Sequence, residues 1–307
     1  MPKTVLLSGA TGFLGSHLLE ALLINGYRVV ILKRSTSDTW RIEHLLEQCT
    51  SYDVDQIPLE EIFKLYQIDY IIHLATFYKK AHLAPDIDLM FDANVTFPTK
   101  LLDLAVAHGT KSFINTGTFF EYDPSILPIS EANTIKTFNL YAKSKLAFEQ
   151  ILKSYADEGK IKASTLKIFS PYGPKDDANK LVPFIVSKAI KNEPFNLSEG
   201  FQKLDFIYAG DIAQAFLKIL LRIDTFSAYE SFNIGSGNTY SVREVVSILE
   251  ELMGVALQKT WGPPSTVDNP IVIASRAKAK ERLDWEPKIS LRSGLQETIK
   301  YYQESLL

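Results

Sequence analysis

A short apolar segment followed by three spaced glycines restricts the fold of this chain more than any other stretch. Residues 4–8 read Thr-Val-Leu-Leu-Ser, which is typical of a strand buried on both faces of a parallel sheet. The next seven residues read Gly-Ala-Thr-Gly-Phe-Leu-Gly, and leucines on one face then predict a helix to about Ile24. A strand, a glycine turn and a helix in this order predict a doubly wound α/β fold with a parallel sheet.

The glycines of this turn have separate roles in a dinucleotide-binding fold. Gly9 permits the tight turn, Gly12 lets the backbone approach a pyrophosphate, and Gly15 allows the helix to pack closely on the strand. The negative charge of the pyrophosphate then lies at the N-terminus of the helix. We predict that the turn binds a dinucleotide in a Rossmann domain, through Gly9, Thr11, Gly12, Phe13, Leu14 and Gly15.

The segment after the second predicted strand, residues 28–32, indicates which dinucleotide is bound. An NAD site usually carries an acid there, which binds the ribose 2′-hydroxyl. This chain instead has Lys33, Arg34 and Ser35, which would attract a 2′-phosphate. The pattern favours NADP(H), while NAD(H) stays possible. The alternative is that Lys33 and Arg34 are solvated surface charges.

The carboxyl ends of the next strands supply further predicted cofactor contacts. Asp53 follows the third strand and reaches the adenine edge or is only a loop acid. The fourth strand covers residues 70–75, and the small Ala75 at its end suits close passage of the cofactor. His73 lies inside this apolar strand and is predicted to be a hydrogen-bonded core residue. The predicted contacts at this strand end are Leu74, Ala75 and Thr76.

Tyr141 and Lys145 are the predicted centre of the chemistry. Their spacing puts both on one face of a helix. A free tyrosine, with a pKa of about 10, exchanges protons poorly at neutral pH. A lysine ammonium one turn away stabilises the phenolate, so we predict a lowered pKa for Tyr141 and proton exchange with an alcohol or a ketone. Such a pair also occurs by chance, so its weight comes from the glycine turn and from Thr118.

Several residues around this pair are candidates for binding the substrate. Thr118 ends a predicted strand, and its hydroxyl is expected to be free to bind a substrate oxygen; the alternative is a threonine that caps a turn. The loop 76–82 lies where ligands bind in open α/β sheets, or is simply exposed. The predicted substrate contacts are Tyr78, His82, Thr118, Phe119, Phe120, Ser170 and Lys203.

Length and composition restrict the remaining possibilities. The 307 residues are long for one simple domain, so we predict a Rossmann domain over 1–170 and a smaller C-terminal α/β lobe for the substrate over 171–307. The chain is expected to return to the first domain from its C-terminal half.

A net charge of −3 gives no reason to expect nucleic acid or an anionic membrane as partner. The single Cys49 excludes an internal disulfide and suits a cytoplasmic location. The sequence begins with a strand rather than a signal peptide, has no membrane-spanning run, and predicts no metal site.

Taken together, these motifs resemble the extended short-chain dehydrogenase/reductases of the NAD-dependent epimerase/dehydratase type. The resemblance covers essentially the whole chain. Its motifs are Gly9–Gly15, His73–Ala75, Asn94-Val95, Thr118, Tyr141 with Lys145, Pro171–Pro174, Asp205–Tyr208 with Asp211, and Phe232–Gly235.

The resemblance implies roles for these residues. Thr118, Tyr141 and Lys145 would be the catalytic triad, and Tyr141, Lys145 and Asn94 would also contact the cofactor. The C-terminal lobe would hold a nucleoside-diphosphate sugar. A homodimer would form through the helices near 86–108 and 141–155.

The subfamily follows from departures from the family pattern. Dehydratases carry an Asp-Glu pair after the catalytic threonine, where this chain has Phe119-Phe120, and two phenylalanines cannot eliminate water. Epimerases that retain NAD usually carry the acid that is missing after the second strand. The segment 115–120 resembles bacterial 4-ketoreductases that make CDP-linked dideoxyhexoses. We therefore predict an NADPH-dependent reductase of a 4-keto-6-deoxy sugar nucleotide in deoxysugar or surface-polysaccharide biosynthesis.

Two alternatives stay open at this point. The first is an epimerase that retains NAD and uses the same triad, and the second is a dinucleotide-binding regulator without catalysis. Two further departures concern the sugar nucleotide: Leu204 replaces a common phosphate-binding arginine, for which the adjacent Lys203 would substitute, and Ser170 replaces a common asparagine.

Overall fold

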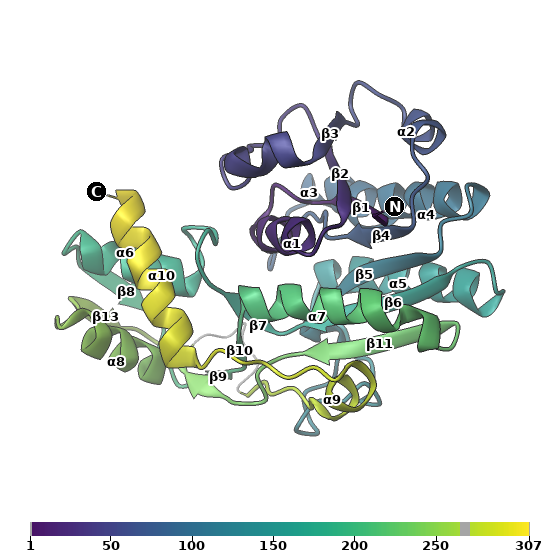
Figure 1. Cartoon of the computed structure of the whole chain (residues 1–307). Helices are drawn as coiled ribbons and strands as arrows, with labels where there is room; N and C mark the ends of the chain where they lie inside the picture. Colours follow the sequence, from purple (N-terminus) through teal and green to yellow (C-terminus); the bar gives the residue numbers. More distant parts are fainter. Residues whose placement is uncertain (1, 265–270, 307) are drawn as a thin grey trace.

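The computed structural model, shown in Figure 1, describes residues 2–264 and 271–306. Its centre is a sheet of seven parallel strands in the order β11-β6-β5-β4-β1-β2-β3. The reversal of strand order at β1 and β4 puts their carboxyl ends at the switch point where ligands bind. The predicted doubly wound fold is thereby confirmed. The strands are β1 (Thr4–Ser8), β2 (Arg28–Lys33), β3 (Thr50–Asp53), β4 (Tyr70–His73), β5 (Ser112–Thr118), β6 (Lys162–Ile168) and β11 (Tyr229–Ile234).

Helices cover both faces of this sheet, which explains why strands β1, β2 and β4 bury apolar side chains on both faces. One layer consists of α1 (Phe13–Ile24), α7 (Ala209–Arg222) and α9 (Ala277–Leu283). The other layer consists of α2 (Leu59–Leu65), α4 (Phe97–Ala107) and α5 (Leu140–Asp157). Short 3-10 turns are η1 (Glu43–Gln48), η3 (Phe119–Glu121) and η4 (Ile223–Thr225).

The helix that precedes β5 is interrupted by a π-helical segment. It consists of α3 (Asp86–Phe91), the π-helix η2 (Asp92–Thr96) and α4. Pro98 lies in the first turn of α4, directly after the π-helix, and it has no backbone N–H to continue the hydrogen bonding of the preceding turn. The interruption therefore lies before the proline, and the π-helix buries Asn94 completely.

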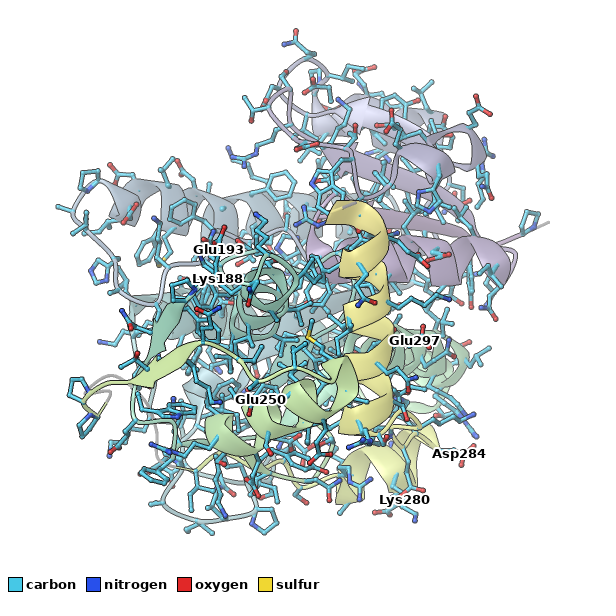
Figure 2. The ribbon with its side chains drawn as sticks, turned by 90° about the vertical axis from the view of Figure 1, so that its left-hand side faces the viewer. Lys188, Glu193, Glu250, Lys280, Asp284 and Glu297 are labelled. Atoms are coloured by element: carbon cyan, nitrogen blue, oxygen red, sulfur yellow. The ribbon has the colours of Figure 1, made fainter. Side chains whose placement is uncertain are left out.

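The C-terminal part has a hydrophobic core of its own, built from buried residues between Tyr172 and Tyr302. Figure 2 shows α10 beside α8, and Lys188 and Glu193 pointing toward each other in an ion pair of 2.6 Å. Exposed ion pairs of this kind contribute little, so the apolar core holds this part together. Its elements are α6 (Leu181–Ile190), α8 (Val242–Met253), α10 (Leu291–Leu306), and the strand pairs β7 (Ser170–Tyr172) with β10 (Phe206–Tyr208), β9 (Lys203–Leu204) with β12 (Tyr240–Ser241), and β8 (Phe195–Leu197) with β13 (Lys259–Trp261).

The described residues, 2–264 and 271–306, contain no helix that is long and apolar enough to cross a membrane. In the same ranges, no group of three or more His, Cys, Asp or Glu side chains is arranged to hold a metal ion.

Candidate active site

The glycine turn joins β1 to α1 at the carboxyl edge of the sheet. Gly9 has a left-handed φ of +76°, and a Cβ atom there would lie 2.5 Å from the Ala75 nitrogen. A Cβ on Gly15 would lie 2.0 Å from the Gly9 carbonyl oxygen. Gly12 is the N-cap of α1 and contributes no side-chain cap, so the first-turn amides can bind an anion. This backbone cradle fits the pyrophosphate of a dinucleotide.

The end of β4 lies directly against this turn. The Leu74 nitrogen donates a hydrogen bond of 3.1 Å to the Ser8 carbonyl, and the Ala75 nitrogen donates one of 3.4 Å to Ser8 Oγ. Ser8 Oγ also lies 2.7 Å from Nδ1 of the fully buried His73. Burial, together with the charge of Lys145, lowers the pKa of His73 well below its usual value. His73 is therefore a neutral, hydrogen-bonded core residue, as predicted.

Asn94 lies behind the predicted cofactor surface, so the expectation of a direct contact is corrected. Its Oδ1 accepts hydrogen bonds from Thr76 Oγ1 (2.9 Å) and the Phe77 nitrogen (2.8 Å). Its Nδ2 donates to the Phe77 carbonyl (3.0 Å) and to Ser144 Oγ (2.9 Å). Because the side chain is fully buried and these four bonds engage it, Asn94 ties the loop after β4 to helix α5.

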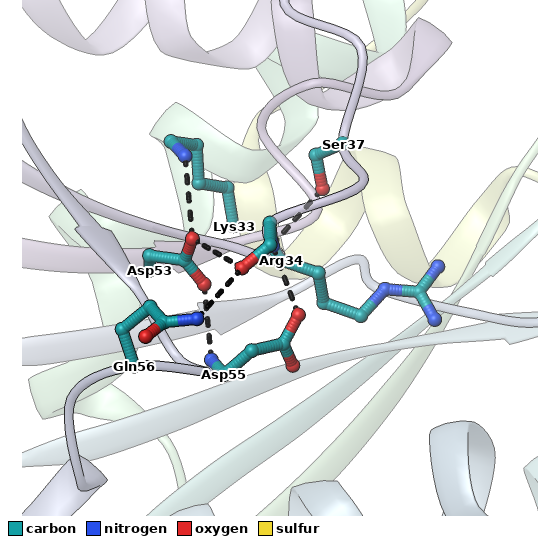
Figure 3. Close-up of polar contacts among 7 residues, drawn as sticks. Lys33, Arg34, Ser37, Asp53, Asp55 and Gln56 are labelled. Atoms are coloured by element: carbon teal, nitrogen blue, oxygen red, sulfur yellow. Dashed lines mark hydrogen bonds and ion pairs between the residues drawn. The ribbon is translucent and has the colours of Figure 1, made fainter.

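The predicted 2′-phosphate site contains two carboxylates from the end of β3 (Figure 3). Lys33 Nζ lies 3.9 Å from Asp53 Oδ2, which also accepts a 2.7 Å hydrogen bond from Ser35 Oγ. The Ser35 nitrogen donates to Asp55 Oδ2 at 2.9 Å. Lys33 and Ser35 thus each contact a carboxylate, and their contacts with a 2′-phosphate stay a prediction. Figure 3 shows the Arg34 guanidinium directed away from Asp53.

Helix α5 brings Tyr141 and Lys145 together in a buried position. The helix begins after Asn139, whose Oδ1 accepts a 2.9 Å hydrogen bond from the Ala142 nitrogen. Tyr141 is 9% exposed and Lys145 is 2% exposed. The Tyr141 hydroxyl is hydrogen-bonded to Thr76.

The pKa of Tyr141 differs in direction from the sequence prediction. Burial raises it, with a further rise from the nearby Glu121 and Tyr78, and these effects outweigh the hydrogen bond to Thr76. Burial also lowers the pKa of Lys145 to about 8. The protein alone therefore holds a protonated phenol beside a lysine that is mostly charged at neutral pH.

Thr118 is buried at the end of β5, and its hydroxyl is not free. Thr118 Oγ1 accepts a 3.3 Å hydrogen bond from the Phe120 nitrogen, and the Thr118 nitrogen donates to Glu121 Oε1 at 2.8 Å. These two bonds form a capping box around η3. The hydroxyl therefore caps the turn, as the alternative interpretation of Thr118 expected, and its proton remains available to donate to a substrate oxygen.

The two phenylalanines after Thr118 belong to an aromatic cluster. The ring of Phe119 lies 5.5 Å from that of Phe169 in a stacked arrangement, and the ring of Phe120 stacks at 5.3 Å on Phe138. Phe119 is buried and is reassigned from substrate contact to the core, whereas Phe120 is only partly buried.

The other predicted substrate contacts lie at different places. The ring of Tyr78 meets that of Tyr141 edge-on at 4.8 Å, and His82 lies exposed in the same loop. Ser170 begins β7, and Lys203 lies exposed on β9. The structure adds Lys180, whose Nζ lies 4.1 Å from the centre of the Tyr78 ring. No local pattern in the sequence pointed to Lys180, because the contact joins distant segments.

A buried charge cluster near this site was also missed. Lys167 Nζ lies 2.7 Å from Glu121 Oε2 and 3.2 Å from Glu149 Oε2. Two sequence signals could have revealed it: Glu121 follows Thr118 with capping-box spacing, and Glu149 lies four residues after Lys145 on the same helical face.

Comparison with known proteins identifies a family, and the relatives include CDP-abequose synthases and UDP-glucose 4-epimerases. The sequence model of the NAD dependent epimerase/dehydratase family matches residues 5–235. A CDP-abequose synthase of Salmonella typhimurium is 30% identical over a 309-residue alignment that covers 98% of each chain. UDP-glucose 4-epimerase 2 of Arabidopsis thaliana is 26% identical, with 94% of this chain and 91% of its own covered. The structure of UDP-glucose 4-epimerase from Thermotoga maritima with UDP-glucose superposes with a TM-score of 0.91 at 27% identity, covering 99% of this chain and 100% of its own.

Proposed function

The chain belongs to the NAD-dependent epimerase/dehydratase family, and on this basis we propose that it reduces the 4-keto group of a nucleoside-diphosphate 4-keto-6-deoxyhexose with NADPH. Its family and relatives make it an enzyme that modifies nucleotide sugars with a nicotinamide dinucleotide. We also propose that residues 1–170 form the dinucleotide-binding domain and that residues 171–307 form mainly the lobe that holds the sugar nucleotide.

The proposed mechanism assigns one task to each residue of the triad. The dinucleotide supplies the hydride when it is bound. Tyr141, whose raised pKa keeps its phenol protonated, donates that proton to the ketone oxygen. Thr118 donates its hydroxyl proton as a hydrogen bond to the same oxygen, while its lone pair stays with the Phe120 nitrogen. Lys145 provides positive charge one turn further along α5 and would hold the nicotinamide ribose when the dinucleotide is bound.

The surroundings of Thr118 disfavour a dehydratase, and the CDP-abequose synthase relative favours reduction over epimerisation by the same triad. Phe119 and Phe120 occupy the positions of the dehydratase acids, and their rings pack on other aromatic residues. Glu121 is the nearest carboxylate in sequence, but it is fully buried and bonded to Thr118 and Lys167. Water elimination needs a carboxyl group at the leaving hydroxyl, and neither the rings nor Glu121 provide one to a substrate. A reduction needs only the triad.

A stoichiometric assay tests this function. Purified protein is mixed with a CDP- or dTDP-linked 4-keto-6-deoxyhexose and NADPH, and nicotinamide absorbance and the sugar product are followed together. We expect one NADPH to be oxidised for each 4-hydroxy sugar formed. Turnover of a UDP-hexose without added coenzyme, by protein that purifies with NAD, would instead support the epimerase that the relatives suggest. NADPH binding without turnover of any ketosugar would support a non-catalytic regulator.

We propose that the preference for NADPH rests mainly on Arg34. Lys33 is paired with Asp53, whereas the Arg34 guanidinium is directed away from that carboxylate (Figure 3). A charged hydrogen bond contributes about 1.5–3 kcal/mol, so Arg34→Ala should weaken NADPH binding about 10- to 100-fold and leave NADH binding unchanged. Fluorescence titration with both nucleotides measures this.

Lys33→Ala is the matched control for this substitution. Since Asp53 already compensates the charge of Lys33, the control should lose much less NADPH affinity than Arg34→Ala. Equal affinity of the unmodified protein for NADH and NADPH would reject the preference.

We further propose a homodimer in the cytoplasm. The short helix α3 packs against α5 and exposes apolar side chains, among them Leu89, which is 53% exposed, and Phe91, which is 40% exposed. Exposed apolar side chains on adjacent helices are typical of an interface between identical chains. Light scattering of the purified protein measures its mass in solution. The single free Cys49 suits a reducing compartment.

A further inference from the structure

Three buried ionisable side chains from three elements meet beside the proposed site. Lys167 of β6 lies between Glu121 of η3, at 2.7 Å, and Glu149 of α5, at 3.2 Å. The Tyr229 hydroxyl donates a 2.8 Å hydrogen bond to Glu149 Oε1. None of the three charged side chains is more than 7% exposed. Apolar residues of similar size would often stabilise a core as well or better, so this cluster calls for a reason beyond stability.

Glu121 connects the cluster to Thr118. Its Oε1 accepts the Thr118 N–H at 2.8 Å, while its Oε2 faces Lys167. The residue before Thr118 is Gly117, where a Cβ atom would lie 3.0 Å from Glu121 Oε1. The glycine leaves room for the Glu121 carboxyl group. By binding the Thr118 N–H, this carboxyl group fixes the backbone at Thr118 and thereby the position of the Thr118 hydroxyl.

The cluster also contacts the helix that carries Tyr141 and Lys145. Glu149 follows them at the next helical turn on the same face. Burial lowers the pKa of Lys145, while the Glu121 and Glu149 charges raise it in opposition. The Glu121 charge also contributes to the raised pKa of Tyr141, after the larger effect of burial.

We propose that Glu121 is a positioning residue for the Thr118–Tyr141–Lys145 site: one carboxyl oxygen holds the Thr118 peptide, and the other joins Lys167 and Glu149 in a buried network of ionisable groups beside α5. This inference rests on the proposed function for the role of the triad. The ionisable groups that face Glu121 come from β6, α5, β11 and its own segment, and are Lys167, Glu149, Lys145, Tyr141, Tyr229 and Tyr122.

The charge state of Glu121 gives the proposal a pH signature. Burial and the neighbouring Glu149 raise the pKa of Glu121 to about 8, although Lys167 opposes the rise. Below that pH the carboxyl is protonated, and a glutamine resembles it. Above that pH the carboxylate keeps Lys145 protonated, which a glutamine cannot do. Replacing Glu121 with Gln should therefore matter more as the pH rises.

Two substitutions at Glu121 separate its hydrogen bond from its charge. Glu121→Gln keeps an acceptor for the Thr118 N–H, and we expect a loss of about threefold in turnover at pH 7 that grows toward pH 9. In the pH profile of NADPH affinity, the alkaline limb, where affinity falls, should shift to a lower pH by about one unit. The reason is that Lys145 loses a nearby opposite charge. Glu121→Leu removes the acceptor and should lower turnover about tenfold or more at every pH, because a buried N–H loses its partner. Thermal melts check that each variant is folded.

Glu131→Gln is the matched control. Glu131 is a partly buried carboxylate that accepts a 2.7 Å hydrogen bond from the Asn233 nitrogen; its charge contributes to the raised pKa of Tyr122 but is not among the causes of the shifts at Tyr141 and Lys145. We expect its pH profiles to coincide with those of the parent protein. Infrared difference spectra of the protein without nucleotide should show a protonated carboxyl band at pH 7 that Glu121→Gln removes.

The outcomes separate this proposal from the proposed function. A shifted NADPH-binding limb together with loss of the infrared band supports the role of Glu121 even if no ketosugar is reduced. Profiles of Glu121→Gln that are parallel to the parent at all pH values, with the infrared band retained, would overturn it. So would equal losses in Glu121→Gln and Glu121→Leu, which would indicate a purely structural residue.

Discussion

Tyr141→Phe should nearly abolish reduction of the ketosugar while NADPH still binds. The substitution removes only the hydroxyl that donates the proton, and general acid catalysis contributes about 10²–10⁴-fold to a rate. The helix should be preserved, because the ring of Tyr141 keeps its edge-on contact with Tyr78 and the N-cap of Asn139 does not involve it. Turnover number and NADPH affinity, measured separately, give the two expected results.

Tyr155→Phe is the control on the same helix. Its hydroxyl donates a 3.2 Å hydrogen bond to Asp103 at an exposed position, outside the proposed site. This variant should turn over at the parent rate. A Tyr141→Phe enzyme that also retained the parent rate would remove Tyr141 from the mechanism, whatever its fold.

The second large effect is expected at the glycine turn. Gly15→Ala places a Cβ atom 2.0 Å from the Gly9 carbonyl oxygen. The backbones of both residues lie at the junction between β1 and α1. Neither can move without separating α1 from β1, so we expect the free energy of unfolding to fall by about 3 kcal/mol or more. Denaturant titration measures the loss, and NADPH binding should disappear with the fold.

Gly12→Ala tests the other role of the turn. A Cβ there would lie 3.3 Å from the Gly9 oxygen, a contact that a small shift relieves. Stability should therefore change little, while NADPH affinity falls about tenfold or more because the backbone can no longer approach the pyrophosphate. Gly262→Ala is the matched control, because its Cβ atom would lie 3.2 Å from the Leu197 carbonyl oxygen, away from the glycine turn, and Gly262, like Gly12, has no positive φ. If Gly12→Ala bound NADPH as tightly as the parent, the turn would not be the pyrophosphate site.

The sequence was most informative where the signals are local. The first strand, the glycine turn and the first helix follow one another directly along the chain. Each of the other buried strands, and the helix that carries Tyr141, is likewise a run of consecutive residues. Each follows from apolar periodicity, glycine conformation or capping over a few residues. The order of these elements then restricts the topology to a doubly wound sheet, because parallel strands need helical crossovers on its two faces.

Two expectations changed because of contacts or local geometry that the sequence pattern did not show. Two cations after β2 favoured a phosphate site, but β3 lies beside β2 and brings Asp53 to Lys33. Asn94 matched a motif, but the π-helix turns it into the interior.

The sequence by itself determined the strands, the glycine cradle and the alignment of Tyr141 with Lys145, since all of these depend on neighbours along the chain. Only the tertiary structure decided which charged side chains are paired and which ionisable side chains stay protonated. Burial raises the pKa of Tyr141, and Glu121 meets Lys167 across two elements. Desolvation and Coulomb interactions depend on distances through space, and these exist only once the chain has folded.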